Sequence, residues 1–163
     1  MTTASPIPPG FHSVTPHMVI KNAAEAMDFY VKAFGAVEIS RFEMPGMGLL
    51  AHGLLQIGSS FVMVADEFPP EFGCADALSP ASAKGTTVAL QIYTEDVDAL
   101  YQRAMEAGCE TIFEPMNAFW GDRYGQVRDP FGHHWAMATH IKDMNAEEIA
   151  AAAAAEFSGA PGD

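Results

Sequence analysis

The spacing of hydrophobic and polar positions changes several times along the chain, and the order of these changes repeats. In the first half, apolar residues that alternate with polar ones predict strands, and apolar residues at helical spacing predict one helix. The strands are expected at Ser13–Lys21, Val37–Met44, Leu49–Ile57 and Ser60–Ala65, and the helix at Ala23–Phe34. The first half therefore has the order β-α-β-β-β.

The helix predicted in the first half carries signals at both of its ends. Asn22 and Glu25 have the spacing of a capping box. Gly35 follows the last apolar residue and is typical of a helix end. Met27 and Tyr30 fall on one face of the helix, so we expect this face to cover a sheet.

The second half repeats the same order of elements. Strands are expected at Thr86–Tyr93, Glu110–Glu114, Gly125–Arg128 and His133–Ile141, and a helix at Val97–Ala107. The two helices start about 74 residues apart, at Ala23 and Val97. Repetition at this period indicates the duplication of a unit that cannot bury its sheet alone.

Five segments follow from this pattern. We expect a flexible N-terminus (1–12), a first βαβββ module (13–67), a linker (68–85), a second βαβββ module (86–142) and a C-terminal helix with a tail (143–163). The linker is rich in proline and small residues, which is also typical of a flap over a pocket. The predicted fold class is α+β, with two tandem βαβββ modules that form a curled mixed sheet around a central cleft.

The chain is acidic, with a formal net charge of −13 and only eight lysines and arginines, which are scattered along the sequence. A nucleic-acid-binding protein needs a basic surface, so we expect no nucleic-acid partner. The acidic balance is compatible with a cationic ligand, but simple solubility is its more ordinary explanation.

The cysteines and the hydropathy of the sequence indicate in which cellular compartment the protein is expected. Cys74 and Cys109 have no CxxC spacing, which fits a reducing cytoplasm and no zinc site. Met1–Gly10 has three prolines and lacks the basic and apolar regions of a secretion signal. No apolar run approaches the ~18 residues that a membrane span requires. We therefore expect a cytoplasmic protein with no membrane partner.

The stretch Phe119–Trp135 contains both tryptophans, two adjacent histidines and the turn sequence Asp129-Pro130-Phe131-Gly132. Proline fixes φ in such a turn, and glycine tolerates a positive φ. Gly121 and Gly125 flank three large polar residues and let the backbone fold sharply. The stretch indicates either the approach to a pocket or a hairpin whose aromatic residues only pack.

Several motifs together resemble those of one family. They are Asp28-Phe29-Tyr30 and Phe34-Gly35 in and after the first helix, Thr15-Pro16-His17, Met63 followed by Asp66-Glu67, and Phe119-Trp120-Gly121 through Asp129-Pro130-Phe131-Gly132-His133. They resemble the vicinal oxygen chelate superfamily of glyoxalase I, bleomycin-resistance proteins and extradiol dioxygenases, and within it the PhnB-like branch. The resemblance covers roughly Val14 to Lys142. It implies the duplicated fold, a small-molecule ligand and a homodimer, but members differ in activity.

Family enzymes hold a divalent metal with one ligand from the first strand and one from the fourth strand of each module. Counted from the helix caps and turns, these positions are Thr15, Met63, Ala89 and Ala136. None of them is a ligand for such a cation. Their neighbours at steps of two along the strands are His17, Gln91 and His134, which include no carboxylate. We therefore expect no metal and no cofactor; the alternative is a displaced site that uses His17 and His134.

The same alternation predicts which side chains line the cleft. On the last strand, His134 and His140 face the cleft, Trp135 and Met137 face the core, and His133 points away. The candidate catalytic residues are His17 and His134, because a histidine can act as a general acid or base without a metal.

The candidate substrate-binding residues are Gln91, Phe61, Met63, Trp120, Arg123 and Tyr124. The last three are expected at the rim of the cleft, where Arg123 can pair with a ligand carboxylate or phosphate. Asp122 or Asp129 is an equally good partner for this arginine. His52, on the third strand, can also face the cleft.

The leading functional hypothesis is a cytoplasmic small-molecule-binding protein, or a metal-independent enzyme, of the PhnB-like branch. If the protein is an enzyme, it is expected to be a glyoxalase-related lyase or isomerase. The alternatives are a metal-dependent lyase or dioxygenase with shifted ligands, a drug-sequestering protein without turnover, and a dimeric scaffold without a pocket.

Overall fold

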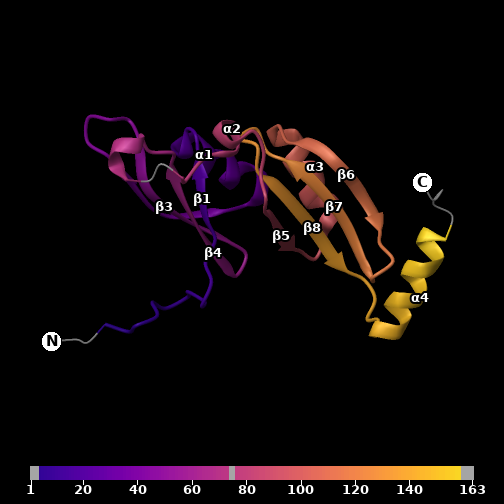
Figure 1. Ribbon diagram of the computed structural model, residues 1–163. Helices are drawn as coiled ribbons and strands as arrows, with labels where there is room; N and C mark the ends of the chain where they lie inside the picture. Colours follow the sequence, from indigo (N-terminus) through magenta and orange to yellow (C-terminus); the bar gives the residue numbers. More distant parts are fainter. Residues whose placement is uncertain (1–3, 74–75, 159–163) are drawn as a thin grey trace.

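The computed structural model describes residues 4–73 and 76–158, and its fold is α+β (Figure 1). The first unit contains β1 (His17–Ile20), α1 (Ala23–Phe34), β2 (Val37–Glu43), β3 (Leu50–Ile57) and β4 (Ser60–Asp66). The second unit contains β5 (Ala89–Tyr93), α3 (Val97–Ala107), β6 (Glu110–Asn117), β7 (Asp122–Arg128) and β8 (His134–His140). The 3-10 helix η1 (Pro70–Phe72) and the short helix α2 (Pro80–Ala83) lie between the units, and α4 (Ala146–Phe157) follows them.

Each unit forms one four-stranded mixed sheet, and the two sheets have the same topology. Their strand orders are β1-β4-β3-β2 and β5-β8-β7-β6. In each sheet the first strand is parallel to the fourth, and the other neighbours are antiparallel. The predicted fold class, α+β with a duplicated βαβββ order, is confirmed. The outer strands β1 and β5 lie at the junction between the units (Figure 1).

Both first strands are shorter than predicted. β1 begins at His17 and β5 at Ala89, although the alternation in the sequence extends further toward the N-terminus. The ladders begin where the parallel neighbour supplies a partner, with His17 opposite Met63 and Ala89 opposite His134. Alternation marks a half-buried strand but cannot show where its neighbour starts.

β6 is longer than predicted, because it continues through Pro115 to Asn117. Proline has no backbone N–H and usually ends a central strand. β6 is the outer strand of its sheet, and its pairing with β7 is irregular between Phe113 and Met116. An outer strand with a bulge tolerates the missing donor.

α1 has the predicted bounds, but the predicted capping box is wrong. Asn22 adopts a left-handed conformation with φ of 65°, and its side chain makes no capping hydrogen bond. Asp66 takes this role from β4: its Oδ1 accepts a hydrogen bond from Ala23 N at 3.0 Å, and its Oδ2 accepts one from Leu50 N at 2.6 Å. A buried carboxylate therefore stabilises the positive end of α1 and ties it to β3.

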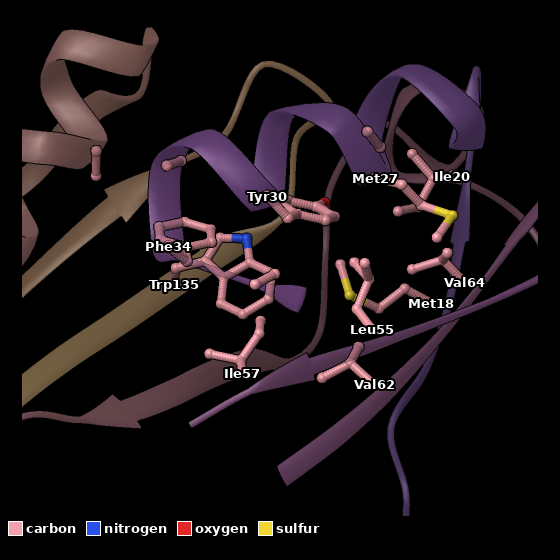
Figure 2. Packing of buried hydrophobic residues seen from close by; sticks show 14 of the residues in the cluster. Met18, Ile20, Met27, Tyr30, Phe34, Leu55, Ile57, Val62, Val64 and Trp135 are labelled. Atoms are coloured by element: carbon pink, nitrogen blue, oxygen red, sulfur yellow. The ribbon is translucent and has the colours of Figure 1, made fainter. Parts of the chain in front are cut away.

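The main core lies between α1 and the sheets and extends across both units (Figure 2). Tyr30 of α1 and Trp135 of β8 are 0% and 1% exposed, and their ring centroids lie 5.2 Å apart. Phe34 packs on the same indole at 4.6 Å. Burial of one large apolar side chain stabilises a fold by roughly 1.5–3 kcal/mol, so this cluster holds the units together.

A buried carboxylate joins the two units beside this cluster. Asp129, in the turn before β8, is 3% exposed. Its Oδ2 accepts hydrogen bonds from Tyr30 Oη at 2.7 Å and from Trp135 Nε1 at 2.8 Å. Its Oδ1 accepts the backbone N–H groups of Phe131 and His133, both at 2.9 Å. The turn that stands out in the sequence therefore fixes the start of β8 against α1.

α4 lies apart from both sheets (Figure 1), and none of its residues is buried. Asn145 and Glu148 form a capping box at its start, and Phe157 contacts the ring of Phe119 at 5.8 Å. Within residues 4–73 and 76–158, no helix has the length and apolar character needed to cross a membrane.

Candidate functional site

The last strand of the second sheet presents its residues alternately to the core and away from it. Trp135 and Met137 belong to the hydrophobic core, as predicted. His134, Ala136 and His140 occupy the intervening positions and therefore lie on the opposite face.

The strand register differs from the positions counted on the sequence. His17, and not Thr15, lies opposite Met63 in the parallel pair of the first sheet. The same shift places Gln91 opposite Ala136 in the second sheet. The two sheets thus carry four equivalent positions, and two of them hold polar side chains.

These four residues do not fit the divalent metal that the family enzymes hold. Only His17 is a usual metal ligand, and the set contains no carboxylate. Across the two described ranges, no group of three or more His, Cys, Asp or Glu side chains is arranged to hold a metal ion.

A cavity of about 420 Å³ lies between β1, the start of β8 and the segment that leads into β5. We call it the histidine cavity, because His17, His133 and His134 line it together with apolar side chains such as Leu78 and Leu90. The structure thus brings His17 and His134 to one cavity. His133 was predicted to point away and lines the cavity as well, because it precedes β8 and does not follow the alternation of the strand.

A second cavity of about 370 Å³ adjoins it on the other side of Leu90. We call it the Gln91 cavity; Phe61 and Gln91 line it, as does Trp135. Met63, beside His17 on the neighbouring strand, does not line either of these two cavities.

Burial shifts the pKa of two histidines in the histidine cavity. Burial, followed by repulsion from His52, lowers the pKa of His17, and the two rings lie 6.0 Å apart. Burial also lowers the pKa of His133, against the opposing effect of Asp129. Nε2 of His133 is buried and has no hydrogen-bond partner among the described residues. Neutral histidines of this kind can accept a proton or a hydrogen bond at physiological pH.

A third cavity of about 610 Å³ lies between the end of β8 and α4. We call it the aromatic cavity; its polar and aromatic lining comprises Tyr93, Trp120, Asp122, His140, Asp143, Asn145 and Glu148.

Asp122, 3% exposed, organises the side chains of the aromatic cavity. Its Oδ2 accepts hydrogen bonds from Tyr93 Oη and Trp120 Nε1, both at 3.0 Å, and its Oδ1 lies 2.8 Å from His140 Nδ1. Burial raises the pKa of Asp122, but these three hydrogen bonds outweigh burial and lower it. Hydrogen bonds with Asp122 and then Asp143 raise the pKa of His140.

The three residues predicted at the rim of the cleft, Trp120, Arg123 and Tyr124, do not lie in one place. Trp120 and Tyr124 contact each other, with ring centroids 5.5 Å apart. Arg123 lies on the other face of β7 and donates two hydrogen bonds to Asp98 of α3, at 2.6 and 2.7 Å. Its partner is therefore neither Asp122 nor Asp129, and the guanidinium is occupied by a surface ion pair.

The pairing of Asp122 with His140 and the contribution of His133 to the histidine cavity were not predicted from the sequence. The pairing of Asp122 with His140 could have been predicted from the hairpin β7–β8, because its register sets these two residues opposite each other. No sequence signal could have placed His133 in the cavity, because the direction of its side chain depends on the turn around Asp129.

Comparison with known proteins agrees with this architecture. Residues 10–137 match the family model described as the Glyoxalase/Bleomycin resistance protein/Dioxygenase superfamily. An uncharacterized protein of Mycobacterium tuberculosis is 42% identical over 147 residues, which cover 90% of this chain and 85% of the relative.

Two solved structures show the same fold. TioX from Micromonospora sp. ML1 has a TM-score of 0.60 and 25% identity, over 82% of this chain and 100% of TioX. A Bacillus cereus protein, described as a putative 3-demethylubiquinone-9 3-methyltransferase and PhnB protein, has a TM-score of 0.58 and 15% identity, over 78% of this chain and 99% of that one. The second likeness concerns the fold alone. With a family model that spans most of its length, the chain belongs to the glyoxalase, bleomycin-resistance and dioxygenase superfamily.

Proposed function

We propose that this protein binds a small, largely apolar molecule in the histidine cavity, without a metal, and that His17 and His134 exchange protons or hydrogen bonds with it. The observation that carries the proposal is the convergence of three histidines on one cavity with apolar walls. Its volume of about 420 Å³ lies within the usual range for small-molecule sites, roughly 300–1,000 Å³.

The chemistry of the cavity supports binding followed by proton transfer. The lowered pKa of His17 keeps this ring neutral near pH 7, so that it can act as a base. His134 lies at the first position of β8, which the Asp129 turn holds in place. The Gln91 cavity adds an amide for orientation, with Phe61 as an apolar wall.

The proposal is tested by ligand-observed NMR with a library of small aromatic and aliphatic compounds. We expect saturable binding that is weakened in Leu90→Trp, because Leu90 lines both cavities and the larger ring narrows them. His134→Ala is expected to weaken binding about tenfold through one lost hydrogen bond. Gln102→Ala serves as the control, because Gln102 is exposed on α3 and is not among the lining residues of either cavity. Equal binding by the wild type and Leu90→Trp would contradict the proposal.

A second candidate function, sequestration of a cationic compound, is supported by the aromatic cavity. Tyr93 and Trp120 offer ring faces for a cation, and Asp143 and Glu148 offer carboxylates. Tetramethylammonium and larger organic ammonium ions are suitable probes in calorimetry. Trp120→Leu is expected to abolish their binding, and an unchanged affinity would remove this candidate.

We also propose that the protein is a cytoplasmic homodimer of the PhnB-like branch. Large apolar side chains are exposed on the outer strands β2 and β6, with Phe42 62%, Phe113 54% and Met116 53% exposed, and their burial against a second copy would stabilise a dimer. Sedimentation at micromolar concentration should give about 35 kDa, twice the 17.5 kDa of one chain. A Phe42→Glu, Phe113→Glu variant should sediment as a monomer, and a monomeric wild type would disprove the dimer.

A further inference from the structure

A fourth cavity, of about 350 Å³, adjoins the histidine cavity and is lined by basic side chains. Lys84, Arg128 and His134 line it, together with α2 and the turn at 130–132. Pro80, Gly85 and His134 line both cavities. The two cavities therefore adjoin at these three residues.

The charge around these two cavities is opposite to that of the whole protein. The chain has a formal net charge of −13 and only eight lysines and arginines. Two of these eight line the fourth cavity, while neither of the two cavities has an aspartate or glutamate among the described residues that line it. In an acidic protein, the two cations and the absence of carboxylates from the described lining favour an anionic group at this junction.

Both cations have hydrogen-bonding capacity to spare. Lys84 has no carboxylate oxygen within ion-pair distance among residues 4–73 and 76–158. Arg128 directs Nε and Nη2 at one oxygen of Glu110, which leaves Nη1 for another acceptor. The net charge of this group, formed by Lys84, Arg128 and Glu110, is +1.

The backbone is shaped to bring these groups together. Gly132 has φ of +93°, and a Cβ at this position would lie 2.8 Å from Cβ of Pro80. The absence of a side chain thus lets α2 approach the turn. Lys84 ends α2 in a left-handed conformation, with φ of 59°.

We propose that the fourth cavity is an anion subsite, which binds the carboxylate of a ligand whose apolar part occupies the histidine cavity. This inference rests on the proposed function of the histidine cavity. Lys84 and Nη1 of Arg128 donate to the carboxylate oxygens, and His134 lies between the two parts of the ligand. A monoanion balances the single excess charge, whereas a dianionic phosphate ester leaves negative charge uncompensated.

Four compounds with one apolar body and different charges test the inference. They are 3-phenylpropionate, 3-phenylpropanol, 3-phenylpropylammonium and 3-phenylpropyl phosphate, titrated while the amide shifts of Gly85 and Gly132 are followed by NMR. We expect the carboxylate to bind about tenfold more tightly than the alcohol, which corresponds to one charge-assisted contact. The ammonium ion should bind more weakly than the alcohol, and the phosphate no more tightly than the carboxylate.

Lys84→Gln is expected to weaken carboxylate binding about tenfold and to leave alcohol binding unchanged. Lys32→Gln, on α1, makes the same change in net charge away from the cavity and is the matched control. Equal affinity for carboxylate and alcohol, or equal losses in the two variants, would overturn the anion subsite and leave the histidine cavity as a neutral site. Absence of saturable binding by all four compounds would overturn both proposals, and tighter binding of the phosphate would refute the monoanion assignment.

Discussion

Replacing Tyr30 by phenylalanine removes one hydroxyl from the contact that joins the two units. This hydroxyl donates to Asp129 Oδ2 at 2.7 Å, and the tyrosine is 0% exposed. Burial, followed by the charge of Asp129, raises the pKa of Tyr30 well above its usual value, so the group remains a donor at any pH of interest. The carboxylate would retain its bond from Trp135 Nε1 at 2.8 Å.

The expected cost follows from the burial and the charge of the acceptor. A hydrogen bond to a charged group contributes about 1.5–3 kcal/mol, and loss of one of four such bonds to a buried carboxylate falls within this range. We therefore expect the free energy of unfolding to fall by about 2 kcal/mol. For a chain of this size, this corresponds to a fall in Tm of roughly 4–8 °C.

Urea unfolding followed by circular dichroism measures this free energy. Tyr101→Phe is the matched control, because its hydroxyl lies 2.6 Å from Thr111 Oγ1 at an exposed position. The control should change stability by less than about 0.5 kcal/mol. If the two variants lose equal stability, the Asp129 network does not hold the units together and the reasoning fails.

Three further predictions concern other parts of the fold. Gly53→Ala should destabilise by about 1–3 kcal/mol in urea unfolding, because a Cβ there would lie 2.4 Å from Met27 Sδ, and an unchanged midpoint would contradict the packing. Burial raises the pKa of Cys109 to about 12, so in a Cys74→Ser background its thiol should react with a disulfide reagent only after unfolding, and rapid native-state reaction would contradict this. The raised pKa of His140 means that its contribution is fully present below the unfolded pKa of about 6.5 and is lost as pH rises through the folded pKa. His140→Asn should therefore lower Tm more at pH 5.5 than at pH 9, and an equal loss at both would exclude the charged pair with Asp122.

The sequence predicted the elements of the fold well and their long-range contacts poorly. The helices Ala23–Phe34 and Val97–Ala107 were predicted with their observed bounds, because each has apolar spacing and a terminal glycine. The cap of the first helix was wrong, because Asp66 lies 43 residues away in sequence from the amide it binds. Local spacing cannot rank a distant carboxylate above an adjacent asparagine.

In the candidate site, too, local features were predicted from the sequence and long-range contacts were not. Alternation correctly separated Trp135 from its neighbours on β8. It could not place His133, which lies in the turn before the strand, nor Lys84 and Arg128, whose meeting depends on the approach of α2 to Gly132. The position of Arg123 depended on Asp98 of α3, another long-range partner. Residues on one strand were therefore predictable, and residues that meet across elements were not.

The cavities differ in charge, and this difference decides between the proposed ligands. The aromatic cavity is lined by Asp122, Asp143 and Glu148, whereas the fourth cavity is lined by Lys84 and Arg128. A net charge of −13 favours cations at long range, so an anion at the fourth cavity must be selected by the nearby Lys84 and Arg128. Raising the salt concentration screens the long-range field and leaves short contacts largely intact. Carboxylate affinity at the fourth cavity should therefore rise or stay constant with salt, while ammonium affinity at the aromatic cavity should fall. If carboxylate affinity falls with salt as steeply as ammonium affinity, the expected difference between the two cavities is wrong, and the net charge of the protein does not oppose the anion at the fourth cavity.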